Sequence, residues 1–73
     1  MEYTNSQIRG IIGEYIHSER DREILLYRFI DGLTIEQIAS RYQATHPDYP
    51  LSTDTVKRII KRSEHELFRH IPG

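Results

Sequence analysis

The sequence predicts a small all-α domain built from four helices. Apolar residues recur at intervals of three and four along most of the chain, and no segment alternates apolar and polar residues as a strand would. Serine or threonine precedes each periodic segment, where its hydroxyl can cap a helix. The 73 residues contain no cysteine, so the core forms without disulfides. Together these features favour a single domain over residues 1–73.

The first predicted helix spans residues 5–17, with Thr4 or Asn5 as its cap. Its apolar face consists of Ile8, Ile11, Ile12, Tyr15 and Ile16. Gly10 and Gly13 each lower helix propensity by about 1 kcal/mol relative to alanine. We therefore expect this helix to depend on packing against the rest of the chain.

The second predicted helix begins after the cap residue Ser18, and acidic residues in its first turns complement the positive end of the helix dipole. It should end at Asp31-Gly32, with Gly32 in the left-handed conformation that ends many helices. One side of it carries Ile24, Leu25, Arg28 and Phe29.

The third predicted helix starts at once, because Thr34 and Gln37 have the spacing of a capping box. It is about ten residues long by its pattern. The buried stripe of this helix consists of Ile35, Ile38, Ala39 and Tyr42.

A loop is predicted over residues 44–51, since Pro47 and Pro50 prevent a continuous helix. Tyr49, beside Pro50, is a candidate to pin this loop. The last helix then begins with Ser52 or Thr53 as its cap, and Pro72-Gly73 ends the chain. Its inward residues are predicted to be Val56, Ile59, Ile60, Ser63, Leu67 and Ile71.

The charge of the chain is distributed unevenly. The net charge is −1, but residues 1–40 carry four basic and seven acidic side chains, and residues 41–73 carry six basic and four acidic ones. Within residues 52–62 the count is four basic to one acidic. This cluster is typical of a DNA-binding helix, and a solvated helix face is the alternative interpretation.

A short helix, a turn and a second helix that is apolar on one side and basic on the other form a helix-turn-helix, here with a lengthened turn. Val56 and Ile60 face the core, which turns the candidate reading surface outward: Thr53, Asp54, Lys57, Arg58 and Lys61. In a major groove, Arg58 suits a guanine edge and Asp54 suits a cytosine amino group. Phosphate contacts are predicted for Lys57, Lys61 and Arg62.

Residues 18–25, 31–39 and 52–60 resemble region 4 of bacterial sigma factors, and the resemblance covers residues 18–71. It implies that the last helix binds the upstream promoter element and that the domain docks on the flap of RNA polymerase. By position, it implies base contacts from Thr53, Asp54 and Arg58. It also implies contacts to the DNA backbone from Thr34, Arg41, Thr55, Lys57 and Lys61.

The sequence departs from the pattern of this family in two ways. The chain has no room for the region that melts promoter DNA, so we expect a stand-alone region-4-like protein, of the type found among small phage or mobile-element regulators. The second departure is the turn. Ala39 and Val56 lie seventeen residues apart, and the excess over the family spacing falls around residues 43–49. The domain is then either a reader with a wider loop or one whose last helix no longer reads DNA.

No catalytic or metal-binding pattern emerges from the sequence. The four histidines, His17, His46, His65 and His70, are never spaced to share a helix face, and surface histidines explain them better than metal ligands. Three of the tyrosines lie within apolar stripes and are predicted to be core residues: Tyr15, Tyr27 and Tyr42. We therefore expect no enzyme, no metal and no cofactor.

The sequence thus predicts a sequence-specific transcriptional regulator that binds double-stranded DNA with the helix starting near Ser52. The alternative is a protein-interaction module that binds RNA polymerase or another regulator without reading DNA. The first helix, residues 1–17, is a candidate homodimer interface. The absence of cysteine, of a signal pattern and of a membrane-length apolar run predicts a cytoplasmic protein with no membrane contact.

Overall fold

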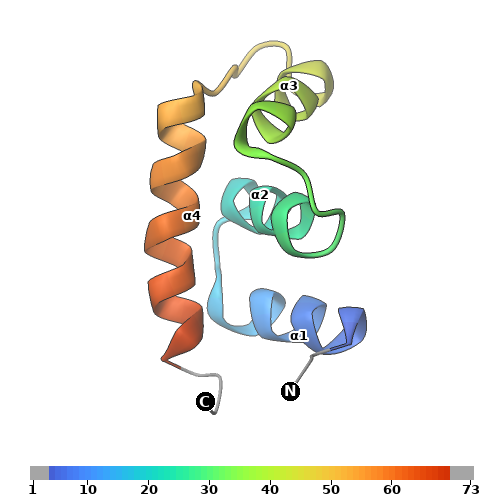
Figure 1. Cartoon of the computed structure of the whole chain (residues 1–73), viewed down its shortest axis with the longest axis vertical. Coiled ribbons are helices and arrows are strands. Elements are labelled where there is room, and N and C mark those ends of the chain that lie inside the picture. The colour runs from blue at the N-terminus through green and yellow to red at the C-terminus, as the bar shows by residue number, and fades with distance from the viewer. Residues whose placement is uncertain (1–3, 70–73) are drawn as a thin grey trace.

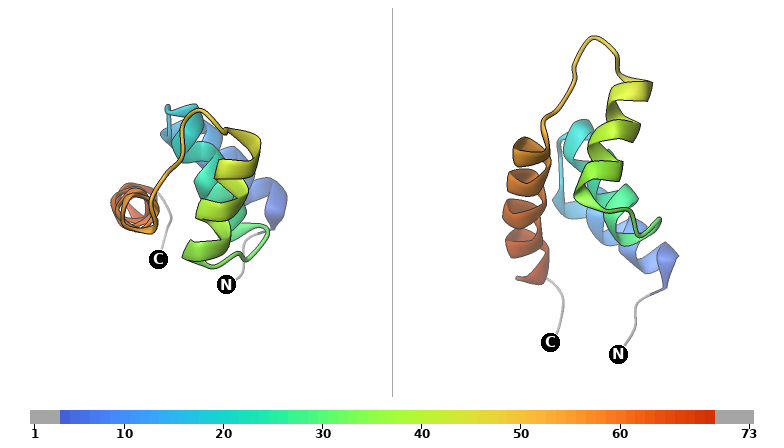
Figure 2. Two further views of the ribbon diagram at one scale, coloured as in Figure 1. Left: turned by 90° about the horizontal axis from the view of Figure 1, so that it is seen from above. Right: turned by 45° about the horizontal axis from the view of Figure 1, so that its top comes forward.

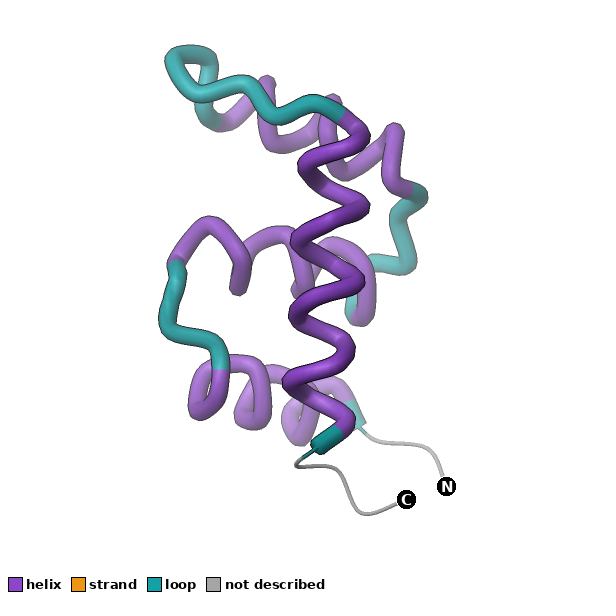
Figure 3. Tube along the Cα trace, turned by 90° about the vertical axis from the view of Figure 1, so that its left-hand side faces the viewer, coloured by secondary structure: helices purple, strands orange, loops and turns teal. Residues whose placement is uncertain are grey.

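The computed structural model of the chain describes residues 4–69, and these residues form four α-helices and no strand, as predicted. The helices are α1 (Asn5–Tyr15), α2 (Glu19–Phe29), α3 (Ile35–Thr45) and α4 (Thr53–Phe68). The first three are stacked one above another along one side of α4, which runs across them (Figures 1 and 3). The view from above places α4 beside the stack rather than within it (Figure 2).

Side-chain hydroxyls cap all four helices. Thr4, Ser18, Thr34 and Ser52 each accept a hydrogen bond from the backbone N–H three residues further on. At α3 the reciprocal bond is also present, since the Thr34 N–H donates to Oε1 of Gln37 over 2.9 Å. The predicted capping box is confirmed, and the two open choices of cap are settled as Thr4 and Ser52.

The boundaries of three helices differ from the prediction. α2 ends at Phe29, short of the predicted Asp31-Gly32. α1 ends at Tyr15 rather than at residue 17, because Ile16 has extended backbone angles and its carbonyl oxygen accepts a hydrogen bond from the Arg22 guanidinium. α3 continues to Thr45, two residues into the predicted loop. A proline disfavours helical conformation in the residue before it, so His46, which precedes Pro47, is the non-helical cap that follows α3.

Arg28, which helical spacing places on the same side of α2 as Ile24 and Leu25, is exposed. One further expectation about a single residue is wrong. The Tyr49 side chain does not pin the loop, since 73% of the residue is exposed. Gly32 does adopt the predicted left-handed conformation, with φ of 68°, in the turn between α2 and α3. The proposed inward residue Ile71, the terminal Pro72-Gly73 and His70 lie outside the described residues.

The core consists of two clusters that share α2 and α4. The larger one joins α2, α3 and α4, and its buried members are Ile24, Ile38, Ala39, Tyr42, Val56, Ile59 and Ile60. The smaller one joins α1, α2 and α4, and its buried members are Ile12, Ile16, Leu25 and Leu67. Tyr15 and Tyr27 are partly buried at the edges of these clusters. The axes of α3 and α4 cross steeply (Figures 1 and 3).

None of the helices in residues 4–69 is both long enough and apolar enough to cross a membrane.

Candidate nucleic-acid interface

The exposed face of α4 follows directly from its buried face. Val56, Ile59, Ile60, Ser63 and Leu67 turn toward the core. With 3.6 residues per turn, the opposite face carries Asp54, Arg58 and Lys61, all of which are exposed. Thr53, at the first helical position, is exposed as well. The three predicted base-reading residues are therefore accessible to a ligand.

A shallow groove of about 380 Å³ lies where the first turn of α3 meets the first turns of α4. Four of the predicted site residues come together there from two separate elements: Thr34, Thr53, Asp54 and Lys57. The groove is also lined by Arg28, Ile35 and Glu36. It follows that the lengthened loop does not separate the first turn of α4 from that of α3.

Arg28 is a groove residue that the sequence interpretation missed. Its Nη1 donates to the backbone carbonyl oxygen of Leu33 over 3.0 Å, so the guanidinium bridges the last turn of α2 and the segment that enters α3. The signal was present in the sequence. A basic residue in the last turn of a helix that ends at a glycine is well placed to bind exposed carbonyl groups.

The opposite flank of α4 carries Thr55 and Arg62, and both already have partners within the chain. The Thr55 side chain lies 3.0 Å from the hydroxyl of the cap residue Ser52. Arg62 Nη2 donates to Oδ2 of Asp21 over 3.1 Å, while 66% of the Arg62 side chain remains exposed. Arg62 therefore ties α4 to α2 and still presents N–H groups to solvent.

Asp21 is one of two buried polar residues in the described chain, and its carboxylate is fully engaged. Its Oδ1 accepts from Nε of Arg20 over 3.1 Å, its Oδ2 accepts from Arg62, and its backbone N–H donates to the cap hydroxyl of Ser18. The two guanidinium groups compensate the buried negative charge.

Arg41 does not join the groove shared by α3 and α4. It lines a separate hollow of about 410 Å³ on the outer face of α3. The other residues of that hollow are Leu33, Glu36, Gln37, Ser40 and Ala44. Glu36 contributes to both hollows, so the two are neighbours on the surface.

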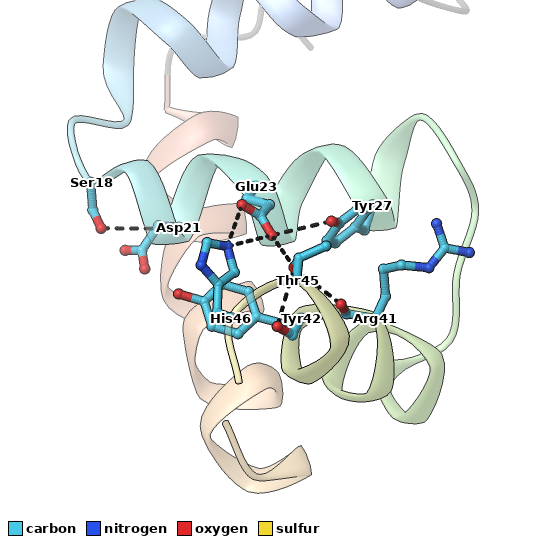
Figure 4. Close-up of polar contacts among 8 residues, drawn as sticks. All are labelled: Ser18, Asp21, Glu23, Tyr27, Arg41, Tyr42, Thr45 and His46. Carbon is cyan, nitrogen blue, oxygen red and sulfur yellow. Dashed lines mark hydrogen bonds and ion pairs between the residues drawn. The ribbon is translucent and has the colours of Figure 1, made fainter. Parts of the chain in front are cut away.

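A polar cluster fixes the far end of α3 on α2 (Figure 4). The Glu23 carboxylate accepts hydrogen bonds from the Tyr27 hydroxyl at 3.1 Å and from Nε2 of His46 at 3.0 Å. The Thr45 hydroxyl lies 3.4 Å from the same carboxylate. Burial raises the pKa of the Tyr27 phenol, and the hydrogen bond to Glu23 and its charge raise this pKa further.

His46 also stacks its ring on Tyr42, with the ring centroids 4.3 Å apart. Sequence spacing had suggested only a surface histidine at this position. The spacing could not reveal the contact with Glu23, because the two residues lie far apart in the chain and meet only when α3 packs on α2.

Within residues 4–69, no group of three or more histidine or carboxylate side chains is arranged to hold a metal ion. The arrangement offers an exposed helix with arginine, lysine and aspartate on one face and a polar groove at its start.

A comparison with protein families finds one informative match. The family model described as sigma-70, region 4, matches residues 18–68, which is well over half of the chain and leaves α1 outside. No curated protein and no solved structure matches the sequence.

Proposed function

Because this chain belongs to the sigma-70 region 4 family of DNA-binding helix-turn-helix domains, we propose that it is a sequence-specific transcriptional regulator whose α4 reads the major groove. The observation that supports this most is the groove at the start of α4, where Thr34, Thr53, Asp54 and Lys57 meet. An α-helix is about 10–12 Å across and a major groove is about 12 Å wide, so one helix fills it.

In this proposal the outer face of α4 contacts base edges. Arg58 donates two hydrogen bonds to a guanine, Asp54 accepts one from a cytosine amino group, and Thr53 contacts a neighbouring base. All three side chains are exposed, and Ser52 holds the first turn of α4 in place through its cap. The order of these residues along the helix then sets the order of the bases that are read.

The two flanks of α4 contact the two sugar-phosphate backbones of the groove. On one flank, Thr34 at the start of α3 and Lys57 contact one strand, and Arg28 lies beside them. On the other flank, Thr55 and Arg62 contact the opposite strand. Lys61 lies on the exposed face, and Arg41 contacts DNA only beyond the groove, from its place on the outer face of α3.

Members of this family bind RNA polymerase as well as DNA, and we propose that this chain contacts the polymerase through a surface that α4 does not use. A regulator of this kind works in the cytoplasm, where the chromosome is. A homodimer through α1 is a further proposal. Ile12 and Ile16 are buried within the single chain, so a second copy would have to use the outer side of α1. Sedimentation over a range of concentrations tests it.

Two substitutions on α4 test the DNA-reading proposal, with duplexes selected from random DNA by the purified protein as the probe. Arg58→Ala should weaken binding to the selected duplex by about 1–3 kcal/mol. Its binding to unrelated DNA should change by no more than the loss of one positive charge explains. Lys61→Ala should weaken binding to all duplexes alike, as expected for a phosphate contact, and should reduce the slope of log affinity against log salt concentration by about one.

The matched pair separates reading from general attraction, since both variants remove one positive charge from the same helix. If both bind every duplex as the wild type does and lose binding to RNA polymerase, the chain is a protein-interaction module and this proposal is wrong.

A further inference from the structure

The loop between α3 and α4 is fixed to the rest of the domain at both of its ends. Helices of a helix-turn-helix are usually joined by a turn of about 3–4 residues. Here seven residues, 46–52, lie between Thr45 and Thr53. The loop they form arches past the adjoining ends of both helices (Figures 1 and 2).

The loop is held firmly where it leaves α3. His46 contacts the Glu23 carboxylate and stacks on Tyr42. The Tyr49 N–H donates to the carbonyl oxygen of His46 over 3.0 Å and so closes a turn, with Pro47 at its second position. Proline restricts this position to the backbone angle that a turn requires, so little conformational entropy is left to lose.

The loop is also held where it enters α4. Leu51 is partly buried against the larger core cluster, and Ser52 caps the helix. Between these two attachments the tip is solvent-exposed, and its residues are Pro47, Asp48, Tyr49 and Pro50. Tyr49 is the one large hydrophobic residue that is exposed within the described chain, at 73%.

The position of Tyr49 relative to the reading helix limits what it can contact. Four residues of chain span at most about 14 Å, so Tyr49 lies no further than that from Thr53. A major groove is about 12 Å wide. When Thr53 lies inside the groove, the loop tip lies within about 14 Å of it, a distance comparable with the width of the groove at whose edges the sugar-phosphate backbones run.

We propose that Tyr49 is an additional DNA contact, whose hydroxyl donates to a phosphate oxygen and whose ring packs on the adjoining sugar. Tyrosine is among the side chains that bind phosphate without adding charge. This inference rests on the proposed function, because it requires α4 to lie in the groove. The extra residues of the loop would then widen the DNA surface that the domain covers, beside the bases that α4 reads.

Asp48 provides an independent measure of where the tip lies. It is exposed, and its carboxylate would repel a nearby phosphate. Asp48→Asn removes this repulsion and should tighten binding to every duplex. Glu14→Gln is the matched control, since it removes the same charge from an exposed residue of α1, at the end of the molecule away from the loop (Figure 1).

The experiment compares Tyr49→Ala, Tyr49→Phe, Asp48→Asn and Glu14→Gln on one selected duplex and one unrelated duplex at several salt concentrations. Tyr49→Ala should lower the affinity for both duplexes by the same factor, about 3–10-fold, as expected for the loss of one hydrogen bond and of the ring contact. The salt slope should not change, because no cation is removed. Tyr49→Phe should lose only the part that the hydroxyl contributes.

The inference is overturned if Tyr49→Ala binds both duplexes like the wild type, or if Asp48→Asn tightens binding no more than Glu14→Gln does. Loss of RNA polymerase binding alone in Tyr49→Ala would make the tip a protein-binding site and overturn it as well. Arg58→Ala keeps the two proposals apart. If Arg58→Ala loses the selected duplex and Tyr49→Ala does not, the loop inference fails and DNA reading by α4 stands.

Discussion

The two core clusters differ in what they hold in place. The larger cluster joins α2, α3 and α4, and its buried residues come from the region that matches the sigma-70 region 4 family. The smaller cluster adds α1, which lies outside that match. The larger cluster sets the angle between α3 and α4. The smaller one packs α1 against α2 at Leu25 and against the end of α4 at Leu67.

Substitutions in the two clusters should therefore affect DNA binding differently. A cavity in the larger cluster should change the relative position of the groove residues Thr34 and Lys57, because they belong to different helices. A cavity in the smaller cluster changes how α1 is attached, and leaves that relative position intact.

Ile38→Ala should nearly abolish folding. Ile38 is fully buried in the larger cluster, and an isoleucine-to-alanine change at such a site costs about 2–5 kcal/mol. Native domains are stable by only about 5–15 kcal/mol, and one this short should lie at the lower end of that range. Urea unfolding followed by circular dichroism measures the loss. Gln43→Ala, at an exposed position of the same helix, should change stability by less than about 0.5 kcal/mol.

Ile12→Ala should affect α1 more than the rest of the domain. Its side chain is buried in the smaller cluster, but the cost is limited by the free energy that α1 gains on packing. Hydrogen exchange should accelerate at the amides of α1, while the amides of α3 keep their protection. Equal acceleration in both helices would show that the two clusters open as one unit and would contradict this prediction.

Asp21→Asn should lower the free energy of unfolding by about 1–2 kcal/mol, because Arg20 and Arg62 lose a buried charged partner. The loss is limited because both arginines are solvent-accessible. Thermal unfolding measures the change. Arg62→Ala should lower stability as well and, in addition, weaken DNA binding, because it removes the proposed backbone contact. If Asp21→Asn and Arg62→Ala weaken DNA binding equally, Arg62 acts only by positioning α4.

Tyr27→Phe should produce the smallest effect, and one that depends on pH. The raised pKa of Tyr27 means that the folded chain holds this proton more tightly than the unfolded chain does. Stability from this source is present below pH about 10 and is lost as pH rises through the higher pKa of the folded state. The phenylalanine variant lacks that loss, so its stability should fall less steeply above pH 10 than that of the wild type. Parallel slopes would contradict the prediction.

The local features of the fold could be predicted from the sequence because they depend on neighbours in the chain. A hydroxyl at Ser18 or Ser52 reaches an N–H three residues away, and Gly32 adopts its backbone angle whatever packs beside it. The exposed face of α4 could be predicted for the same reason, since helical spacing alone opposes Arg58 to Val56.

The pairings between helices could not be predicted, because nothing in a local pattern says which helix will lie opposite. Asp21 meets Arg62 across 41 positions, and Glu23 meets His46 across 23. The same limit explains the loop. Its length was visible as an insertion, but its two attachments depend on contacts made by other helices. The role of Arg28 was missed because helical spacing places it beside apolar residues and does not show the Leu33 carbonyl oxygen that its guanidinium binds.

The participation of α4 in both clusters has a consequence for how the protein is made. Val56, Ile59 and Ile60 complete the larger cluster and Leu67 completes the smaller one, and all four residues belong to α4, which leaves the ribosome after the other three helices. A nascent chain that has emerged only as far as the loop holds α1, α2 and α3 with neither core closed. Folding is therefore delayed until α4 has emerged, and the apolar faces of the first three helices are exposed to aggregation during that interval.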